Sequence, residues 1–352
     1  MKINKISSSR IDNVDFNNLL FGRNFSDHML ICHYKNNSWG DPEIKPYSSI
    51  PMTPGTQVLH YGQSIFEGMK AFKNQEDEIL LFRKNDNFER LNRSAERLSI
   101  PKIPKEIFIN GLDALLTLDA DWLKKEDNYS LYIRPFIFAS SECIKASSAT
   151  EFTFMIITSP TSAYYEDDID VVVEEHYTRA PKGGVGFTKA AGNYASSFFP
   201  TKQANKKGFT QIIWTDALEH KYIEESGTMN IWFRINDTLY TPELSDSILA
   251  GITRDSIIQL ARDNGIDVVE KKILVADIIE ASRDNQLKEI FGTGTAVTVI
   301  PIKSMTYQDN KINLPIIEDR FSSKLKLLLQ GIQKGKVIDQ YGWTTKVTPI
   351  TV

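Results

Sequence analysis

The chain has 352 residues, of which 41% are hydrophobic and 24% charged, and its formal net charge at pH 7 is −4. This length favours about two domains, which bury enough apolar surface to fold without disulfides or a structural metal. The composition is ordinary for a soluble globular protein, and the sequence has no basic block that would indicate nucleic acid as a partner. Cys32 and Cys143 form no CxxC pair, and the five histidines lack metal-ligand spacing, so no metal site is expected.

Two free thiols are typical of a protein in a reducing compartment. The first residues, MKINKISSSRIDNVDF, contain no apolar core like that of a signal peptide. The uncharged stretch 152–165 is too short and too polar to cross a bilayer. We therefore expect a cytoplasmic protein with no membrane partner.

Hydrophobic periodicity predicts strands and helices in the first half of the chain. The predicted elements are a hairpin of strands at 69–73 and 78–82, helices at 86–98 and 107–123, and strands at 130–138 and 152–157. Asp86 is the expected N-cap of the first helix. Pro135 indicates that its strand is an edge strand or carries a bulge, because proline cannot donate to a sheet ladder.

The second half continues the mixed pattern after a polar, proline-containing segment at 158–168. Its predicted strands are 169–174, 211–215, 229–235 and 295–300, and its predicted helices are 194–207, 253–264 and 322–334. This predicts an α+β (mixed α/β) protein. We expect a small N-terminal domain at residues 1–160, a connector at 161–168 and a larger C-terminal domain at 169–352.

Two segments carry charged groups suited to catalysis. In residues 187–194, Lys189 precedes three small residues, so it is either a surface lysine before a helix or a desolvated amine able to form a Schiff base. In residues 222–233, Glu224 and Glu225 are adjacent on a predicted strand and point to opposite faces. At most one of them then lies in a shared pocket, and a solvated strand edge is the alternative.

Other segments are suited to binding anions. The helix that starts near Thr253 offers free N–H groups to an anion, although Thr253 as a simple N-cap explains the pattern equally well. The run 292–297 could form a backbone anion nest, but a strand follows it, which excludes a dinucleotide fingerprint. Tyr132, Arg134 and Phe136 share one strand face, as in a carboxylate clamp, and the alternative is an edge arginine paired with an acid.

Taken together and in this order, these segments resemble the fold-type IV aminotransferases that use pyridoxal 5′-phosphate, and specifically the branched-chain amino-acid aminotransferases. The matching motifs lie at 59–72, 87–91, 131–135, 189–194, 225–230, 251–254 and 291–296. They span nearly the whole chain from about residue 55 onward. Ala191 and Ala250 depart from the family pattern, which has glycine and proline there.

The resemblance implies a cofactor between two domains. Lys189 would be the catalytic residue, which binds pyridoxal 5′-phosphate covalently and moves the substrate proton. Glu225 would keep the pyridine nitrogen protonated, and Tyr194 would hydrogen-bond the phenolic oxygen. The remaining cofactor-binding residues would be Arg90 at the phosphate, with Thr228, Ile252, Thr253 and Thr295.

The resemblance also implies a substrate pocket that takes both aliphatic and acidic side chains. Its apolar walls would include Phe66 and Tyr194. The substrate-binding polar groups would be Tyr132, Thr295 and Ala296 at the α-carboxylate, and Arg134 and Tyr61 at the distal carboxylate of glutamate. A loop at 143–148 would close the partner subunit's pocket, so a homodimer is expected.

The implied reaction is reversible transamination of L-leucine, L-isoleucine or L-valine with 2-oxoglutarate, with ping-pong kinetics. The nearest alternatives keep fold and cofactor but change the substrate, as in a D-amino-acid aminotransferase or an aminodeoxychorismate lyase. An alternative from another class is a catalytically silent protein that binds a phosphate ligand. Lys189, Glu225 and Arg90 together argue against that last reading.

Overall fold

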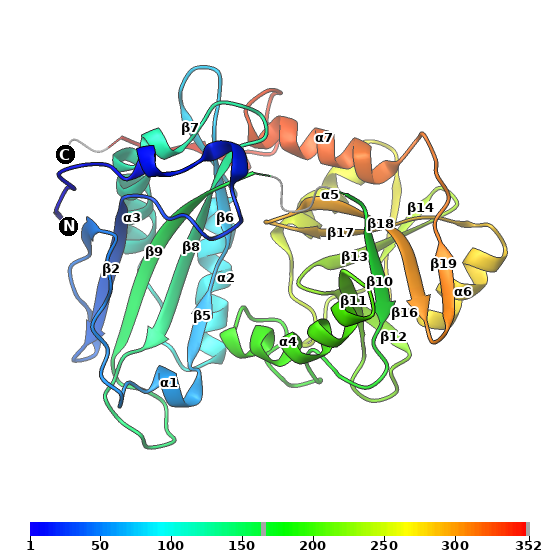
Figure 1. Cartoon of the computed structure of the whole chain (residues 1–352), viewed down its shortest axis with the longest axis horizontal. Coiled ribbons are helices and arrows are strands. Elements are labelled where there is room, and N and C mark those ends of the chain that lie inside the picture. The colour runs from blue at the N-terminus through cyan, green and yellow to red at the C-terminus, as the bar shows by residue number, and fades with distance from the viewer. Residues whose placement is uncertain (163–166, 350–352) are drawn as a thin grey trace. The chain divides into compact units, whose positions relative to one another are not determined.

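The computed structural model describes residues 1–162 and 167–349. Both halves of the chain combine helices with a large sheet, as Figure 1 shows, which confirms the predicted mixed α/β class. No helix within the described ranges is both long enough and apolar enough to span a bilayer.

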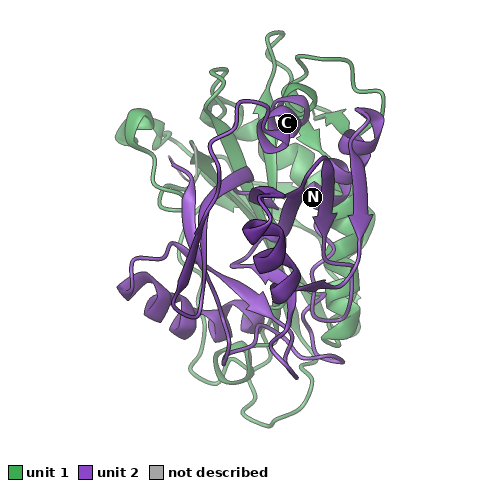
Figure 2. Cartoon of the chain, turned by 90° about the vertical axis from the view of Figure 1, so that its right-hand side faces the viewer, with its two compact units in different colours: residues 1–164, 188–191, 331–352 green, residues 165–187, 192–330 purple. Residues whose placement is uncertain are grey.

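The chain divides into two compact units (Figure 2). The first unit contains residues 1–164, 188–191 and 331–352, and the second contains 165–187 and 192–330. The sequence predicts the 188–191 and 331–352 segments in the second domain. In the structure, both segments belong to the first unit instead. The C-terminal strand at Thr344–Lys346 pairs with the strand at Ile79–Phe82 of the first sheet. Residues 163–166 of the predicted connector lie outside the described residues.

The first unit is built on a sheet of ten strands in the described part of the chain. Its strands follow the order β1-β4-β2-β9-β8-β6-β7-β20, with β3 on β2 and β5 on β8. The strands are β1 (Lys2–Ile3), β2 (His28–Lys35), β3 (Ser38–Trp39), β4 (Glu43–Pro46), β5 (Ser64–Phe66), β6 (Met69–Lys73), β7 (Ile79–Phe82), β8 (Ser130–Ala139), β9 (Phe152–Thr161) and β20 (Thr344–Lys346). The helices are η1 (Ile11–Asn13), η2 (Phe16–Asn18), α1 (Val58–Tyr61), α2 (Lys84–Arg97), α3 (Lys105–Leu118) and η3 (Ala120–Trp122).

The core of this unit lies between the sheet and the helices α2 and α3. Phe88, Leu91 and Ala95 recur on one face of α2 and are buried, as their spacing predicts. They pack with Phe108 of α3 and Leu81 of β7 in one apolar cluster. Burial of this face, rather than intrinsic propensity, stabilises the helix.

Several predicted boundaries in the first unit are wrong. Asp86 is not the N-cap of α2, because the helix begins at Lys84 and Arg83 stands before it with φ 50°. The Asp86 carboxylate accepts hydrogen bonds from the Arg83 guanidinium at 3.1 Å instead. The helix predicted to reach residue 123 ends at Leu118, and β9 continues to Thr161 into the segment predicted as a polar connector.

Pro135 lies in a central strand, so its prediction as an edge or bulge residue is also wrong. Strand β8 pairs in continuous register with β9 along its whole length. On the other side of β8, strand β5 ends and strand β6 begins opposite Pro135. The Glu67 N–H, between these two strands, donates to the Pro135 carbonyl at 2.7 Å. The missing proline N–H is tolerated because the partner strands are interrupted there.

The second unit is built on another ten-stranded sheet among the described residues. Its order is β15-β14-β13-β17-β18-β10-β11-β12-β16, with β19 on β18. The strands are β10 (Ile169–Val173), β11 (Gln211–Thr215), β12 (Tyr222–Ser226), β13 (Asn230–Ile235), β14 (Thr238–Thr241), β15 (Asp267–Glu270), β16 (Ile273–Leu274), β17 (Leu287–Gly294), β18 (Thr298–Tyr307) and β19 (Asn310–Asn313). The helices are α4 (Ala191–Lys206), α5 (Ile252–Asp263), α6 (Val275–Arg283) and α7 (Phe321–Gln333), of which only α6 was not predicted.

A buried ion pair joins the two helices of the first unit. The Lys84 Nζ atom lies 3.0 Å from Asp113 Oδ1, and both side chains are buried. We predict that Lys84→Ala lowers the free energy of unfolding by about 3–5 kcal/mol, because it leaves the Asp113 charge buried without a partner. Guanidinium unfolding followed by circular dichroism measures this change.

The double variant Lys84→Met with Asp113→Leu is expected to recover most of that loss, because it removes both charges together. The exposed pair Lys102–Glu96 supplies the control, and Lys102→Ala should change stability by about 1 kcal/mol or less. Equal effects of the buried and exposed lysine variants would contradict the prediction.

Candidate active site

Lys189 is held against the first sheet by its own backbone. Its N–H donates to Ser94 Oγ of α2 at 3.0 Å, and its carbonyl accepts from the Phe66 N–H at 3.0 Å. The next residue, Ala190, forms an isolated β-bridge with Ile65 of β5. The half-buried side chain places Nζ 4.9 Å from the centroid of the Phe66 ring. This segment is therefore fixed by two elements and is not a loose surface loop.

Arg134 approaches the same aromatic ring. Its Cζ lies 4.5 Å from the Phe66 centroid, and its Nη2 donates to the Tyr132 hydroxyl at 3.0 Å. These contacts confirm that Tyr132 and Arg134 share one face of β8. Arg134 Nε is buried and has no hydrogen-bond acceptor among the described residues. A buried donor of this kind is rare and is available to an anionic ligand.

Gly68 makes room for the Tyr132 hydroxyl. A Cβ atom at position 68 would lie 2.2 Å from Tyr132 Oη and 3.0 Å from its Cζ. The contact is possible because Gly68 has no side chain. Gly68, between β5 and β6, therefore permits the observed position of the Tyr132 side chain. Tyr132 in turn positions Arg134 through their hydrogen bond.

Arg90 of α2 is buried and already has a counter-ion. Its Nε lies 2.7 Å from Glu67 Oε1, and its Nη2 lies 2.8 Å from Glu67 Oε2. This bidentate pair fixes the plane of the guanidinium and neutralises its charge. Glu67 was not predicted as a site residue, although it belongs to the motif at residues 59–72.

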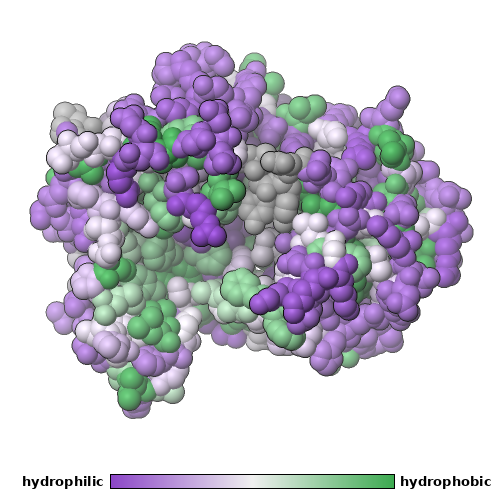
Figure 3. All heavy atoms as spheres, viewed as in Figure 1, coloured by the Kyte–Doolittle hydropathy of each residue, from purple (hydrophilic) through white to green (hydrophobic). Residues whose placement is uncertain are grey.

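Tyr61 lies at an exposed end of the first unit. Its hydroxyl donates to the carbonyl of Ile144, and it has no hydrogen bond to Arg134 among the described residues. The neighbouring side chains of Ile144 and Leu59 are 70% and 60% exposed. Figure 3 shows apolar residues at this end of the unit, where Figure 1 places α1.

In the second unit, Glu225 is buried within β12. Its Oε1 accepts from the Leu249 N–H at 2.7 Å, and its Oε2 lies 2.8 Å from Arg179 Nε. Its neighbour Glu224 is also buried and accepts a hydrogen bond from Ser247 Oγ. The alternative of a solvated strand edge is therefore wrong for both residues. Arg179 belongs to none of the recognised motifs, so no sequence signal pointed to it.

The remaining predicted residues lie on three segments at one end of the second sheet. Thr228 is in the turn between β12 and β13, and Thr295 and Ala296 are in the turn between β17 and β18. These turns approach each other, because a Cβ on Gly294 would lie 3.9 Å from the Thr228 carbonyl oxygen.

The third segment is the start of α5, which meets the same end of the sheet. A Cβ on Gly251 would lie 1.9 Å from Asn230 Oδ1, so glycine is required at this approach. Gly251 is the N-cap of α5, and Ile252 and Thr253 are buried in its first turn. The alternative that Thr253 is the N-cap is therefore wrong. Tyr194, in the first turn of α4, is half-buried.

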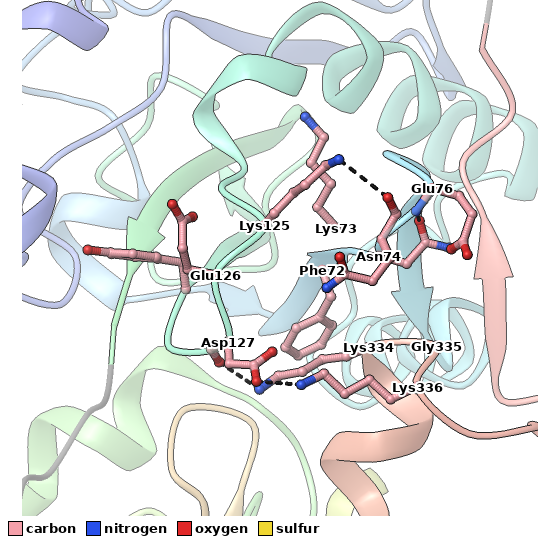
Figure 4. Close-up of a pocket in the computed structure, with 12 residues that line it drawn as sticks. Phe72, Lys73, Asn74, Glu76, Lys125, Glu126, Asp127, Lys334, Gly335 and Lys336 are labelled. Atoms are coloured by element: carbon pink, nitrogen blue, oxygen red, sulfur yellow. Dashed lines mark hydrogen bonds and ion pairs between the residues drawn. The ribbon is translucent and has the colours of Figure 1, made fainter.

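A separate pocket of about 290 Å³ lies in the first unit (Figure 4) and contains none of the predicted site residues. Its lysines are paired with nearby acids. Lys125 binds Asp77 at 2.6 Å, and Lys336 binds Asp127. These two lysines are therefore already neutralised by acidic neighbours. No group of three or more potential metal ligands occurs in the described ranges.

Comparisons with known proteins match the chain to aminotransferases, and the matching relatives align with nearly its whole length. The family model described as amino-transferase class IV matches residues 64–305. Branched-chain-amino-acid aminotransferase 2 of Bacillus subtilis (strain 168) is 44% identical over 352 residues, which cover 99% of this chain and 97% of that protein. A probable branched-chain-amino-acid aminotransferase of Staphylococcus epidermidis (strain ATCC 12228 / FDA PCI 1200) is 42% identical over 339 residues, covering 95% and 94%.

A solved structure gives the same result. The branched-chain aminotransferase of Thermoproteus uzoniensis, crystallised with norvaline, superposes with a TM-score of 0.75 at 25% identity. The match covers 91% of this chain and 100% of that one.

The contact at Gly68 predicts a coupled pair of variants. Gly68→Ala should lower the free energy of unfolding by about 1–3 kcal/mol, because the new methyl group overlaps the Tyr132 hydroxyl. Adding Tyr132→Phe removes the nearest atom and should recover part of that loss. Denaturant unfolding of the single and double variants measures the coupling. Strictly additive effects would show that the overlap does not limit this site.

Proposed function

The chain belongs to the amino-transferase class IV family, and we propose that it catalyses reversible transamination between L-leucine, L-isoleucine or L-valine and 2-oxoglutarate. The observation that carries this proposal is the cluster at Phe66, where the Lys189 amine and the Arg134 guanidinium approach one aromatic ring. It combines an amine for chemistry, an apolar surface for an aliphatic side chain and a cation for a carboxylate.

The residues present fit pyridoxal 5′-phosphate as the cofactor. Glu225 is a buried carboxylate held by Arg179 and a backbone N–H, which suits a partner for a protonated ring nitrogen. Lys189 would bind the cofactor, Tyr194 would contact its phenolic oxygen, and Arg90 would contact its phosphate. When bound, the cofactor supplies an electron sink for the substrate Cα.

The phosphate contact of Arg90 is supported by its ion pair. Because Glu67 accepts hydrogen bonds from Nε and Nη2 of Arg90, the plane of the guanidinium is fixed. Thr228, Ile252, Thr253 and Thr295 would add backbone and hydroxyl donors from the second unit. A group already oriented before binding loses less entropy when the ligand arrives.

Lys189 would move the substrate proton between Cα and the cofactor carbon. A general base must remain within reach of both positions, and the backbone hydrogen bonds to Ser94 and Phe66 fix the start of the lysine side chain. The Phe66 ring beside Nζ also limits access of water to the amine.

Arg134 would select the acidic partner substrate. Its buried Nε is a donor for the distal carboxylate of glutamate, and Tyr132, with Thr295 and Ala296, would contact the α-carboxylate. Phe66 supplies an apolar wall for an aliphatic side chain. One pocket can thus accept both substrates when the arginine is supported by the Tyr132 hydroxyl and not by an acid.

We further propose a cytoplasmic homodimer. The loop at 143–148 lies beside α1 at an exposed end of the first unit. The side chains of Ile144 in this loop and of Leu59 in α1 are largely exposed. The exposed apolar side chains on this loop and on α1, which Tyr61 joins through its hydrogen bond to Ile144, favour a protein interface. Tyr61, which binds this loop, would then contribute to a pocket completed by the partner subunit.

Lys189→Ala should abolish transamination with L-leucine and 2-oxoglutarate, because no other amine replaces Nζ at the Phe66 ring. The fold should remain, as judged by circular dichroism and thermal unfolding. Lys182→Ala, an exposed lysine on the preceding loop, is the matched control and should behave like the wild type. Near-wild-type turnover in Lys189→Ala would overturn the assignment of this residue.

Arg134→Gln should slow the half-reaction with 2-oxoglutarate much more than the half-reaction with L-leucine. We expect kcat/KM for 2-oxoglutarate to fall by about 30- to 100-fold, the loss of about 2–3 kcal/mol from a buried charge pair. The half-reaction with L-leucine should fall much less, because leucine has no distal carboxylate. Single-turnover changes in the cofactor's visible spectrum measure both, with Arg93→Gln on the exposed face of α2 as control.

The same assay distinguishes the alternative enzymes of this fold. Wild-type protein that carries the cofactor should react with L-leucine and not with D-leucine. Reaction with D-leucine alone would favour a D-amino-acid aminotransferase. If Arg134→Gln lowers the rates of the half-reactions with 2-oxoglutarate and with L-leucine by the same factor, this arginine does not discriminate between the two substrates.

A further inference from the structure

A second buried glutamate stands beside Glu225 and has no part in the proposed reaction. Glu224 is 9% exposed, and its Oε1 accepts a hydrogen bond from Ser247 Oγ. Its Oε2 atom is buried and has no hydrogen-bond donor among the described residues. A carboxylate removed from water with a single hydroxyl donor is costly, so this group requires an explanation.

The two neighbouring carboxyl groups have different surroundings. Glu225 has a backbone N–H at 2.7 Å and the cationic Arg179 at 2.8 Å, which both stabilise a negative charge. Among the described residues, the hydrogen-bond donor to Glu224 is the neutral hydroxyl of Ser247. The surroundings of Glu225 therefore stabilise a negative charge more than those of Glu224 do.

The charges that face Glu224 agree with this difference. Burial raises the pKa of Glu224 above its usual value of 4.5, and the negative charge of Asp216 acts in the same direction. The hydrogen bond from Ser247 and the charge of Arg179 oppose this rise in pKa but do not cancel it. The uncharged acid is therefore favoured over a wider pH range than for an exposed glutamate.

Both glutamates hold the same loop, which joins β14 to α5 at residues 245–249. Ser247 donates to Glu224, and two residues later the Leu249 N–H donates to Glu225. This loop also touches the segment that leads to Lys189. The Phe187 N–H donates to the Asp246 carbonyl at 2.9 Å.

The approach between the two segments is close. A Cβ on Gly186 would lie 2.6 Å from Ser247 Cα, and the Gly186 carbonyl accepts from Arg179 Nη2 at 2.8 Å. Movement of Ser247 would therefore be transmitted to the position of Arg179 and of the Leu249 N–H. Both groups are partners of the Glu225 carboxylate.

We propose that Glu224 is a positioning residue, whose buried carboxyl group holds the 245–249 loop through Ser247 and so keeps Glu225 oriented toward the cofactor's ring nitrogen. The inference rests on the proposed function, because the role assigned to Glu225 exists only in an enzyme that binds pyridoxal 5′-phosphate.

The protonation state can be tested through stability, independently of activity. An acid whose pKa is raised on folding stabilises the protein fully below its unfolded pKa, and this stabilisation is lost as the pH rises through the folded pKa. In Glu224→Gln this contribution is absent. Thermal unfolding of the holoenzyme between pH 5 and pH 9 should therefore show the wild type losing stability relative to Glu224→Gln as the pH rises.

Glu243→Gln is the matched control, because this exposed glutamate lies just before the loop and should leave the pH dependence unchanged. If the stability difference between wild type and Glu224→Gln is independent of pH, or changes in the opposite direction, the Glu224 carboxyl group is not held in this buried environment and the proposal fails.

The positioning role is tested by titration of the protein with pyridoxal 5′-phosphate. Glu224→Ala should raise the dissociation constant by about tenfold, the effect of one buried hydrogen bond, and Glu224→Gln should restore most of that loss. Ser247→Ala removes only the hydroxyl that donates to Glu224 and should raise the dissociation constant by a similar factor. This variant replaces Glu224→Ala in the test if Glu224→Ala does not fold. Wild-type affinity in these variants overturns the positioning role. A wild-type protein that binds no cofactor overturns the proposed function instead, and the stability test still reports on Glu224.

Discussion

Neutralisation of buried charge is the constraint on which the rest of this structure depends. Glu225 is out of contact with water, and the nearby Arg179 compensates its charge at 2.8 Å. Arg90 is buried in the first unit and is compensated by Glu67 at similar distances. An uncompensated ion in either place would cost several kcal/mol, so each site residue requires a partner that the reaction itself does not use. The orientation of the catalytic groups is set by these partners before any ligand binds.

Arg134 differs from this pattern in a way that matters for binding. Its guanidinium rests on the Phe66 ring and the Tyr132 hydroxyl, and neither of these groups carries a negative charge. Within the described part of the chain, the arginine is therefore supported without an acidic partner. A substrate carboxylate can supply the missing charge, whereas an aliphatic side chain meets the aromatic ring beside it. In the proposed function, acceptance of both acidic and aliphatic substrates depends on this difference in support.

Glycines determine how closely the segments of each unit approach. Gly68 admits the Tyr132 hydroxyl, Gly186 admits the loop that carries Ser247, and Gly251 admits Asn230 at the start of α5. At each of these positions a Cβ would lie closer than 3.0 Å to a neighbouring atom. The site geometry thus depends on small residues outside the catalytic set as much as on the charged ones.

The amino-acid sequence alone predicted the mixed α/β class, five of the seven α-helices and fewer than half of the strands in the described residues, and it identified the family. Periodicity was sufficient for α2, because Phe88, Leu91 and Ala95 recur at helical spacing, and the ordered motifs carried the resemblance. Only the tertiary structure decided the partners. Arg179, Glu67 and Ser247 are far along the chain from the residues they hold, and spacing along a sequence contains no information on such contacts. The strand ends were likewise decided by long-range pairing, which outweighs local preference when the backbone groups are buried.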